Sequence, residues 1–124
     1  MDIGTLKNNK TFYKGFEDEY EIELIISENP EYNIHIWEGY FGDIFDKPVF
    51  DGREWKGFTR DYQQEVNTYG EKNTKIDVDE YLGDLYIYKD RRFRFEETKD
   101  CYKLLCSFLE YAKKERLTVL VNWW

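Results

Sequence analysis

The chain has 124 residues, with 26 acidic and 18 basic side chains, so its formal net charge at pH 7 is −8. This length is typical of one domain with one hydrophobic core, and we expect a single domain over residues 1–124. The acidic balance excludes a protein that holds nucleic acid through its phosphates, because such binding depends on lysine and arginine displacing counterions. We therefore expect a basic protein partner and no direct contact with nucleic acid.

Aromatic residues make up 19% of the chain, as 11 Tyr, 9 Phe and 4 Trp. Each ring buries roughly 150–250 Å² in a folded protein, so a packed core is expected although many residues are charged. No stretch approaches the roughly 18 apolar residues of a membrane span, and the first residues lack the apolar stretch of a secretory signal. We expect a cytoplasmic protein that does not contact membranes.

The first third of the chain shows the alternation that is typical of strands. A short strand is expected over residues 10–16. Residues 20–26 place apolar side chains on one face and glutamates on the other. Residues 32–37 alternate in the same way after a turn at Pro30. We expect the last two strands to be antiparallel neighbours.

Residues 38–54 combine three glycines and a proline with several aromatic side chains. We interpret this segment as a hydrophobic loop and not as a linker, because linkers are polar and bury nothing. Such a loop is expected to fold back on the domain or to present its rings to a partner.

Helical spacing returns in the middle of the chain. Apolar rings at intervals of three and four residues favour a helix over residues 55–66, with a strand from Phe58 onward as the alternative. Residues 76–85 predict a short helix. Residues 85–88 and 93–95 predict the two strands of a hairpin.

The strongest helical pattern lies near the C-terminus. A continuous apolar stripe from Cys101 to Ala112 predicts an amphipathic helix over about residues 98–115, with Thr98 as its N-cap. Residues 117–121 then predict a final short buried strand. Together these elements predict an α+β fold, in which an antiparallel sheet packs against a few helices.

Residues that usually carry catalysis or hold metals are scarce. The chain has one histidine, His35, and two cysteines, Cys101 and Cys106. Cysteines five residues apart in a helix point to different faces, so we expect reduced thiols. Neither a zinc-binding spacing nor a glycine-rich phosphate loop occurs in the sequence. We therefore expect no catalytic residue, no metal, no cofactor and no enzymatic activity.

One acidic group leaves an enzymatic alternative open. Asp77 and Asp79 have the spacing of cation-binding or paired catalytic carboxylates, and Glu80 follows them. Such residues more often form the solvated first turn of a helix, where the helix dipole favours them. The alternative function is a small carboxylate- or metal-dependent hydrolase.

Negative charge is concentrated in residues 17–54. This segment holds twelve acidic and two basic side chains, so it carries −10 while the remaining residues carry +2. If only the acidic side chains are considered, solvation of one sheet face and its loops would explain them. Aromatic side chains lie between them, however, and rings supply binding area while carboxylates orient a partner. The expected partner-binding residues, including a second acidic patch, are Glu17, Asp18, Glu19, Trp37, Glu38, Tyr40, Phe41, Asp43, Asp46, Asp51, Asp77, Asp79, Glu80 and Asp84.

A basic run at residues 89–94 has the opposite charge. We interpret it as a solubilising turn, because charged side chains often protect an edge strand. A further alternative for the whole chain is an acidic nucleic-acid mimic or adaptor that binds several basic proteins.

Several segments together resemble immunity proteins of bacterial contact-dependent growth inhibition and related polymorphic toxin systems. They are residues 37–42 (Trp-Glu-Gly-Tyr-Phe-Gly), 55–62 (Trp-Lys-Gly-Phe-Thr-Arg-Asp-Tyr) and 81–85 (Tyr-Leu-Gly-Asp-Leu), followed by the closing amphipathic helix and strand. The likeness spans most of the chain. No functional residue of the family carries over, because contact residues differ from pair to pair.

The resemblance implies a stoichiometric protein inhibitor in the bacterial cytosol. Such a protein binds the C-terminal toxin domain of a cognate effector and neutralises it, often by covering its active site. Many of these toxins are basic nucleases, which suits an acidic aromatic surface. We expect a monomer or a weak homodimer, for which Trp123 and Trp124 are candidate contacts.

Overall fold

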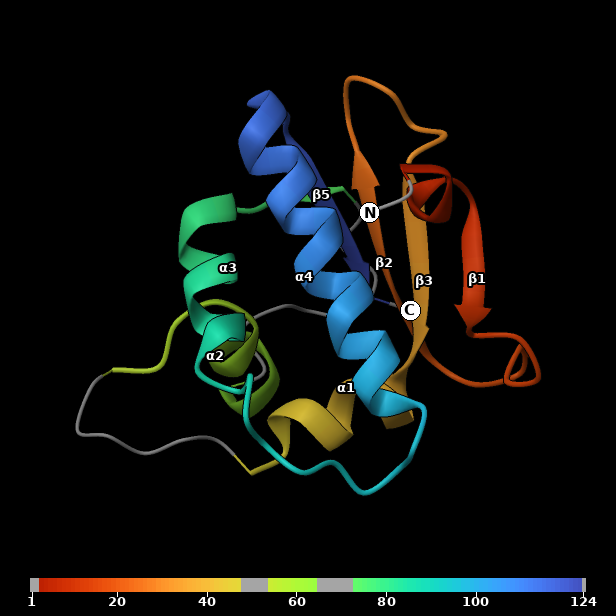
Figure 1. The fold of residues 1–124 in the computed structure, drawn as a ribbon, viewed down its shortest axis with the longest axis vertical. Helices are drawn as coiled ribbons and strands as arrows, with labels where there is room; N and C mark the ends of the chain where they lie inside the picture. The colour runs from red at the N-terminus through yellow and green to blue at the C-terminus, as the bar shows by residue number, and fades with distance from the viewer. Residues whose placement is uncertain (1–2, 48–53, 65–72, 124) are drawn as a thin grey trace.

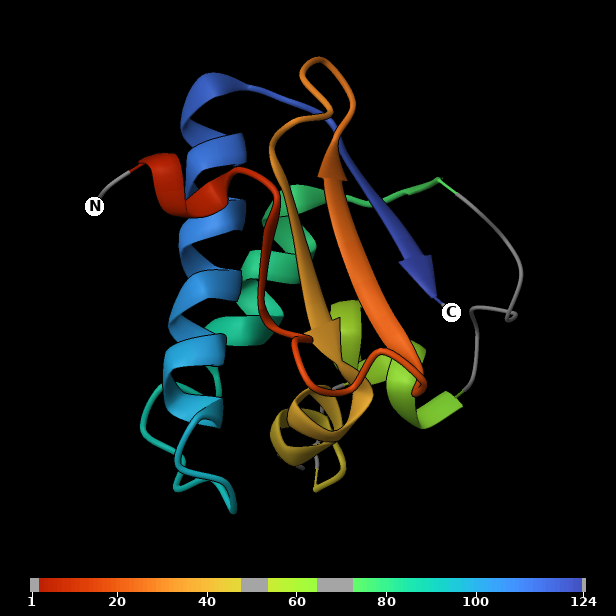
Figure 2. The same ribbon diagram turned by 90° about the vertical axis from the view of Figure 1, so that its right-hand side faces the viewer.

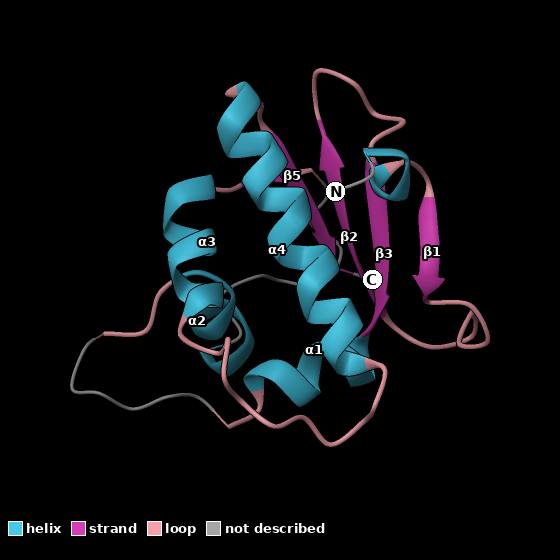
Figure 3. Ribbon diagram, viewed as in Figure 1, coloured by secondary structure: helices cyan, strands magenta, loops and turns pink. Residues whose placement is uncertain are grey.

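A mixed β-sheet forms the centre of the fold, and helices cover one of its faces (Figure 1). The computed structural model describes residues 3–47, 54–64 and 73–123. Their strands are β1 (Asn9–Phe12), β2 (Glu21–Ile26), β3 (Asn33–Trp37), β4 (Thr74–Lys75) and β5 (Val119–Trp123). Their helices are the 3₁₀ helix η1 (Ile3–Leu6), α1 (Glu38–Phe45), α2 (Gly57–Gln64), α3 (Val78–Tyr86) and α4 (Thr98–Glu115). Figure 3 shows how these helices and strands are distributed.

The strand order is β1-β3-β2-β5-β4. β2 is antiparallel to both β3 and β5, as expected for β2 and β3, and β4 is antiparallel to β5. β1 runs parallel to β3, so the sheet is mixed and not purely antiparallel. The α+β prediction, with its C-terminal helix and final strand, is confirmed.

Alternation along β2 explains why only one sheet face carries helices. Ile22, Leu24 and Ile26 are buried, while Glu21 and Glu23 point to the opposite face. Figure 2 shows α3 and α4 on the same side of the strands. The apolar side chains of the sheet therefore pack against the helices, and the glutamates lie on the face without them.

Helix α4 supplies the longest apolar stripe of the core. Every residue of the predicted stripe from Cys101 to Ala112 is buried, and the helix spans the predicted residues 98–115. It ends at Glu115, and the next residue, Arg116, has the left-handed backbone conformation common after helices (φ 55°). The N-cap prediction is wrong, because Thr98 lies inside the helix and Glu97 precedes it.

The predicted loop over residues 38–54 is a helix in its first half. Residues 38–45 form α1, which buries Tyr40, Phe41, Ile44 and Phe45. These four follow the i, i+1, i+4, i+5 pattern of one helix face. Gly39 and Gly42 in this stretch favoured a loop over a helix in the sequence. Residues 48–53 lie outside the described residues.

The predicted hairpin over residues 85–95 is also wrong. Helix α3 extends to Tyr86, and Tyr88 after it is fully buried. Phe93 and Phe95 lie in the loop before α4, half-buried against the core. The two thiols, Cys101 and Cys106, are free and buried, as expected for reduced cysteines.

Among the described residues, no helix combines the length and the apolar character needed to cross a membrane.

Two helical glycines give a test of this packing. A Cβ added to Gly83 in α3 meets nothing within 4 Å, whereas one added to Gly42 in α1 lies 2.8 Å from the Tyr62 hydroxyl oxygen. We expect Gly83→Ala to raise the free energy of unfolding by about 0.5–1 kcal/mol, because alanine loses less backbone entropy in a helix. For Gly42→Ala, urea denaturation should show a smaller increase in the free energy of unfolding, or a decrease. Equal gains in both variants would contradict the close contact of α1 with Tyr62.

Candidate functional site

Four aromatic rings from distant parts of the chain meet at one end of the domain. Phe16 lies flat on Trp37, with ring centroids 3.9 Å apart and planes 4° apart. Tyr40 stands edge-on to Trp37 at 5.1 Å, and Phe95 contacts both Trp37 and Tyr40 at 5.8 and 5.9 Å. Tyr40 is buried, while the other three are half-buried. We call these residues the aromatic cluster (Phe16, Trp37, Tyr40 and Phe95).

Gly39 fixes the position of Trp37 in this cluster. Trp37 is the last residue of β3 and the N-cap residue of α1. Its ring lies over the first turn of α1, where a Cβ on Gly39 would be 2.3 Å from the indole. Any side chain at position 39 would therefore displace the ring. The glycine that made this segment look like a loop is needed to seat the tryptophan.

An acidic loop (residues 17–19) lies beside the aromatic cluster. Its three carboxylates, Glu17, Asp18 and Glu19, are all exposed. The Tyr13 hydroxyl lies 2.9 Å from the carbonyl oxygens of both Glu17 and Glu19 and donates to them. Both Glu17 carboxylate oxygens accept from the Gly15 N–H at 3.0 Å, and this bond lowers the pKa of Glu17. The loop is thus ordered by its own hydrogen bonds.

The acidic loop is also attached to α1. The Glu38 N–H, in the first turn of α1, donates to the Tyr20 carbonyl at 3.0 Å. Phe16, just before the loop, is stacked on Trp37. Six predicted partner-binding residues are therefore brought together: Glu17, Asp18, Glu19, Trp37, Glu38 and Tyr40.

A second pair of carboxylates lies next to Phe95 of the aromatic cluster. Glu96 and Glu97 are exposed and directly follow Phe95. Burial raises the pKa of Tyr40, and the charge of Glu97 adds to this shift. Sequence reasoning missed Phe16, Phe95, Glu96 and Glu97. We call the whole set the acidic aromatic surface (residues 17–19, Glu38, Glu96, Glu97 and the aromatic cluster).

Asp43 fastens the loop that carries Phe95. Its carboxylate accepts from the Arg94 and Phe95 N–H groups, both at 2.9 Å, and from the Thr98 hydroxyl at 2.7 Å. These bonds tie α1 to the residues before α4. Asp43 was expected to bind a partner, but its oxygens are used inside the domain.

The other partner-binding residues predicted within the segment 17–54 are not part of this surface. Phe41 is fully buried, and its ring packs against Phe45, Phe58 and Trp123, so a partner cannot reach it. Asp46 is exposed at the end of α1. Asp51 lies outside the described residues.

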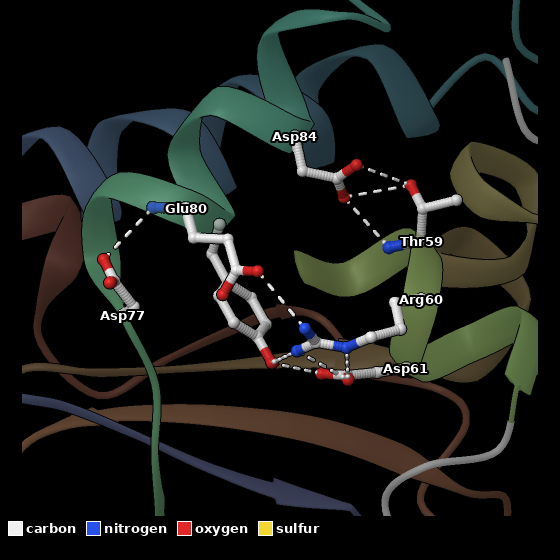
Figure 4. A network of polar contacts seen from close by, with 7 residues as sticks. Thr59, Arg60, Asp61, Asp77, Glu80 and Asp84 are labelled. Atoms are coloured by element: carbon white, nitrogen blue, oxygen red, sulfur yellow. Dashed lines mark hydrogen bonds and ion pairs between the residues drawn. The ribbon is translucent and has the colours of Figure 1, made fainter. Parts of the chain in front are cut away.

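The second predicted patch is a network between α2 and α3 (Figure 4). Asp77 is the N-cap of α3 and accepts from the Glu80 N–H at 3.2 Å. Glu80 pairs with Arg60 at 3.2 Å, and exposed Asp79 pairs with Lys113 at 3.1 Å. Each of these carboxylates therefore has a partner within the domain.

Asp84 is the buried end of this network. It accepts from the N–H and the hydroxyl of Thr59 at 2.9 and 2.8 Å, and it is only 9% exposed. Gly57 permits this close approach of α2 and α3, since its φ is +58° and a Cβ there would lie 2.9 Å from the Asp84 Cβ. Burial raises the pKa of Asp84 to about 6. Asp84 joins α2 to α3 and offers no surface to a partner.

The described residues offer few groups for catalysis. No group of three or more His, Cys, Asp or Glu side chains among them could hold a metal ion. Burial raises the pKa of the Cys106 thiol to about 11 and that of the Cys101 thiol further. Both ring nitrogens of His35 face oxygens, with Nδ1 2.8 Å from Glu21 and Nε2 3.2 Å from Glu23.

The role of Asp43 can be tested by its removal. Asp43→Ala leaves two backbone N–H groups and a hydroxyl without their acceptor, so we expect the free energy of unfolding to fall by about 1–3 kcal/mol. The amide resonances of Arg94 and Phe95 should shift in the same variant. Asp46→Ala, one turn away and exposed, is the control and should change stability by less than about 0.5 kcal/mol. Equal effects would show that Asp43 does not fasten the loop.

The buried carboxyl of Asp84 predicts a pH-dependent stability. The pKa of this carboxyl is about 6 in the folded chain, against an ordinary value of 3.8. Between pH 3.8 and pH 6 the folded chain therefore binds a proton that the unfolded chain has released. Lowering the pH from 7.5 to 4.5 should therefore stabilise the wild type relative to Asp84→Asn by about 2 kcal/mol. Urea denaturation at both pH values measures the difference, with Asp90→Asn as an exposed control. A difference that does not change with pH would contradict the raised pKa.

Comparisons with known proteins identify no relative of this chain. No protein-family model matches it, and neither a curated protein nor a solved structure is significantly similar to it.

Proposed function

We propose that the chain is a stoichiometric protein inhibitor that binds the toxin domain of a cognate effector in the bacterial cytosol. The observation that carries this proposal is the acidic aromatic surface. Its four rings come from three segments of the chain, and exposed carboxylates directly follow two of these rings: residues 17–19 after Phe16, and Glu96 and Glu97 after Phe95.

The aromatic cluster has the composition of an interface centre. Trp and Tyr are enriched among the residues that dominate binding energy at interfaces. Around them, a rim of residues that contribute little energy themselves keeps water out of the centre. Trp37, Phe16 and Phe95 are half-buried, so part of each ring faces solvent before binding. Residues 17–19, Glu38, Glu96 and Glu97 supply the polar rim.

The order of the acidic loop favours binding. The Tyr13 hydroxyl and the Gly15 N–H hold the loop in one conformation without any partner. A partner that binds a preordered loop does not have to order it, so less conformational entropy is lost on association. A smaller entropy loss gives a tighter complex, and in tight complexes the gain in affinity lies mostly in slow dissociation, which an inhibitor of a toxin needs.

The charge of the surface specifies the chemistry of the partner. The whole chain carries −8, and residues 17–54 alone carry −10. Complementary potentials raise association rates from about 10⁵–10⁶ to about 10⁸–10⁹ M⁻¹s⁻¹ at low salt. A basic toxin domain, such as a nuclease, is therefore the expected partner.

A growth assay tests the function directly. The C-terminal domain of the cognate effector, for which we expect a gene immediately upstream of the gene for this chain, is expressed in a bacterial host with and without the chain. We expect growth arrest by the domain alone and growth at the normal rate when the chain is co-expressed. Growth arrest in both cases would contradict the proposal for that pair. Similar binding to unrelated basic proteins would instead favour the nucleic-acid mimic.

Binding kinetics with the same toxin domain test the surface. Asp18→Asn combined with Glu19→Gln should lower the association rate about three- to tenfold at low salt and little at high salt. Gly39→Ala, which displaces the Trp37 ring, should raise the dissociation rate about tenfold or more. Glu110→Gln combined with Glu115→Gln removes the same charge from the last turns of α4 and is the control. Unchanged rates in the first two variants, with native circular dichroism, would exclude this surface.

A further inference from the structure

A cavity lies on the sheet face opposite the helices. Its volume is about 440 Å³, which falls in the range of small-molecule sites. Lys10 and Thr11 of β1 line one side, and Tyr13, Lys14 and Glu17 of the following turn line another. Glu21 of β2 and His35 of β3 form the floor. Of these lining residues, Glu17 alone also belongs to the acidic aromatic surface.

The floor of the cavity is fixed by a polar network across three strands. His35 Nδ1 lies 2.8 Å from a Glu21 oxygen, and His35 Nε2 lies 3.0 Å from the Asn33 side-chain oxygen. Nε2 also faces Glu23, which accepts from Asn122 of β5 at 3.0 Å. Both ring nitrogens of His35 are thus engaged, so the imidazole has no free nitrogen for a ligand.

The acceptors on the wall are also engaged within the domain. The Tyr13 hydroxyl donates to main-chain carbonyl oxygens, which leaves its ring as apolar wall. Both Glu17 carboxylate oxygens accept from the Gly15 N–H. The positive charge of Lys14 lies close enough to add to the lowering of the Glu17 pKa, which is due first to that N–H.

Three polar groups of the lining have no such partner. Within residues 3–47, 54–64 and 73–123, neither the Lys10 nor the Lys14 ammonium forms an ion pair, and the Thr11 hydroxyl forms no hydrogen bond. All three can donate, and two of them are cations. Glu17 and Glu21 balance the formal charge of the lining, but the two ammonium groups and the hydroxyl are the groups left without partners, and these three favour an acceptor with negative charge.

We propose that this cavity binds a small organic anion. Its carboxylate or phosphate group lies against Lys10, Lys14 and Thr11, and its body packs on the Tyr13 ring. Charge-assisted hydrogen bonds to the ammonium groups supply the anion preference, and the ring supplies apolar contact. This ligand site does not depend on the proposed toxin partner.

Matched small probes test the site on the full chain. Phenyl phosphate, benzoate, inorganic phosphate and neutral benzamide are titrated at constant ionic strength and followed by ¹H–¹⁵N NMR and calorimetry. We expect at least one aromatic anion to bind saturably with a Kd below about 1 mM. The shifted resonances should lie at the cavity-lining residues, and benzamide should produce none of these shifts. Phenyl phosphate against benzoate distinguishes a phosphate ligand from a carboxylate one, and inorganic phosphate shows what the ring contributes.

Charge-neutral variants decide whether the cavity is responsible. Lys10→Gln combined with Lys14→Gln should weaken anion binding about tenfold or more, since both ammonium donors are lost. Lys99→Gln combined with Lys103→Gln removes two exposed lysines of α4 at the same spacing and is the control. Native circular dichroism confirms that each variant folds. Binding that is absent for all three anions, or equally weakened in both variants, would overturn the proposal. Neither result would bear on toxin inhibition.

Discussion

The packing of the sheet's apolar side chains against the helices on one face is the constraint on which the rest of the structure depends. Ile22, Leu24 and Ile26 of β2 are buried on the helical side, and the stripe of α4 is buried in the same core. Because strand residues alternate between faces, this fixes the glutamates of β2 on the opposite face. A polar network around His35 forms there in consequence, and the cavity lies above it. The aromatic cluster lies where the sheet ends and α1 begins.

The elements that could be predicted from sequence are those whose burial is periodic over several turns or strand residues. Helix α4 was predicted in full because its stripe runs from Cys101 to Ala112 without interruption. Helix α1 was missed because Gly39 and Gly42 suggested a loop. Those glycines are required for packing, because a Cβ at position 39 would clash with Trp37 and a Cβ at position 42 would lie against Tyr62. A glycine required by a neighbour far along the chain looks the same in sequence as a glycine required by a turn.

The site was partly predictable for the same reason. Residues 17–19 and Trp37 could be proposed because charge and rings are concentrated in one segment. Phe95 could not, since that loop is brought to α1 by contacts between residues about fifty apart in the sequence, such as those of Asp43 with the Arg94 and Phe95 N–H groups. The role of a carboxylate depends on which N–H groups lie within reach, and that is a property of the fold. Asp43 and Asp84 look like partner-binding acids in the sequence and are acceptors inside the domain.

Carboxylates that hold the fold together also prepare the surface that remains. Asp43 fixes the loop that carries Phe95, and Glu17 closes the turn that carries Phe16. Asp18 and Glu19 are exposed within that ordered turn, and Glu96 and Glu97 follow the fixed Phe95. A fixed charge beside a desolvated ring orients a partner more strongly than a mobile one, because less freedom is lost when the complex forms. The negative charge of this chain is therefore most effective where internal hydrogen bonds have already positioned it.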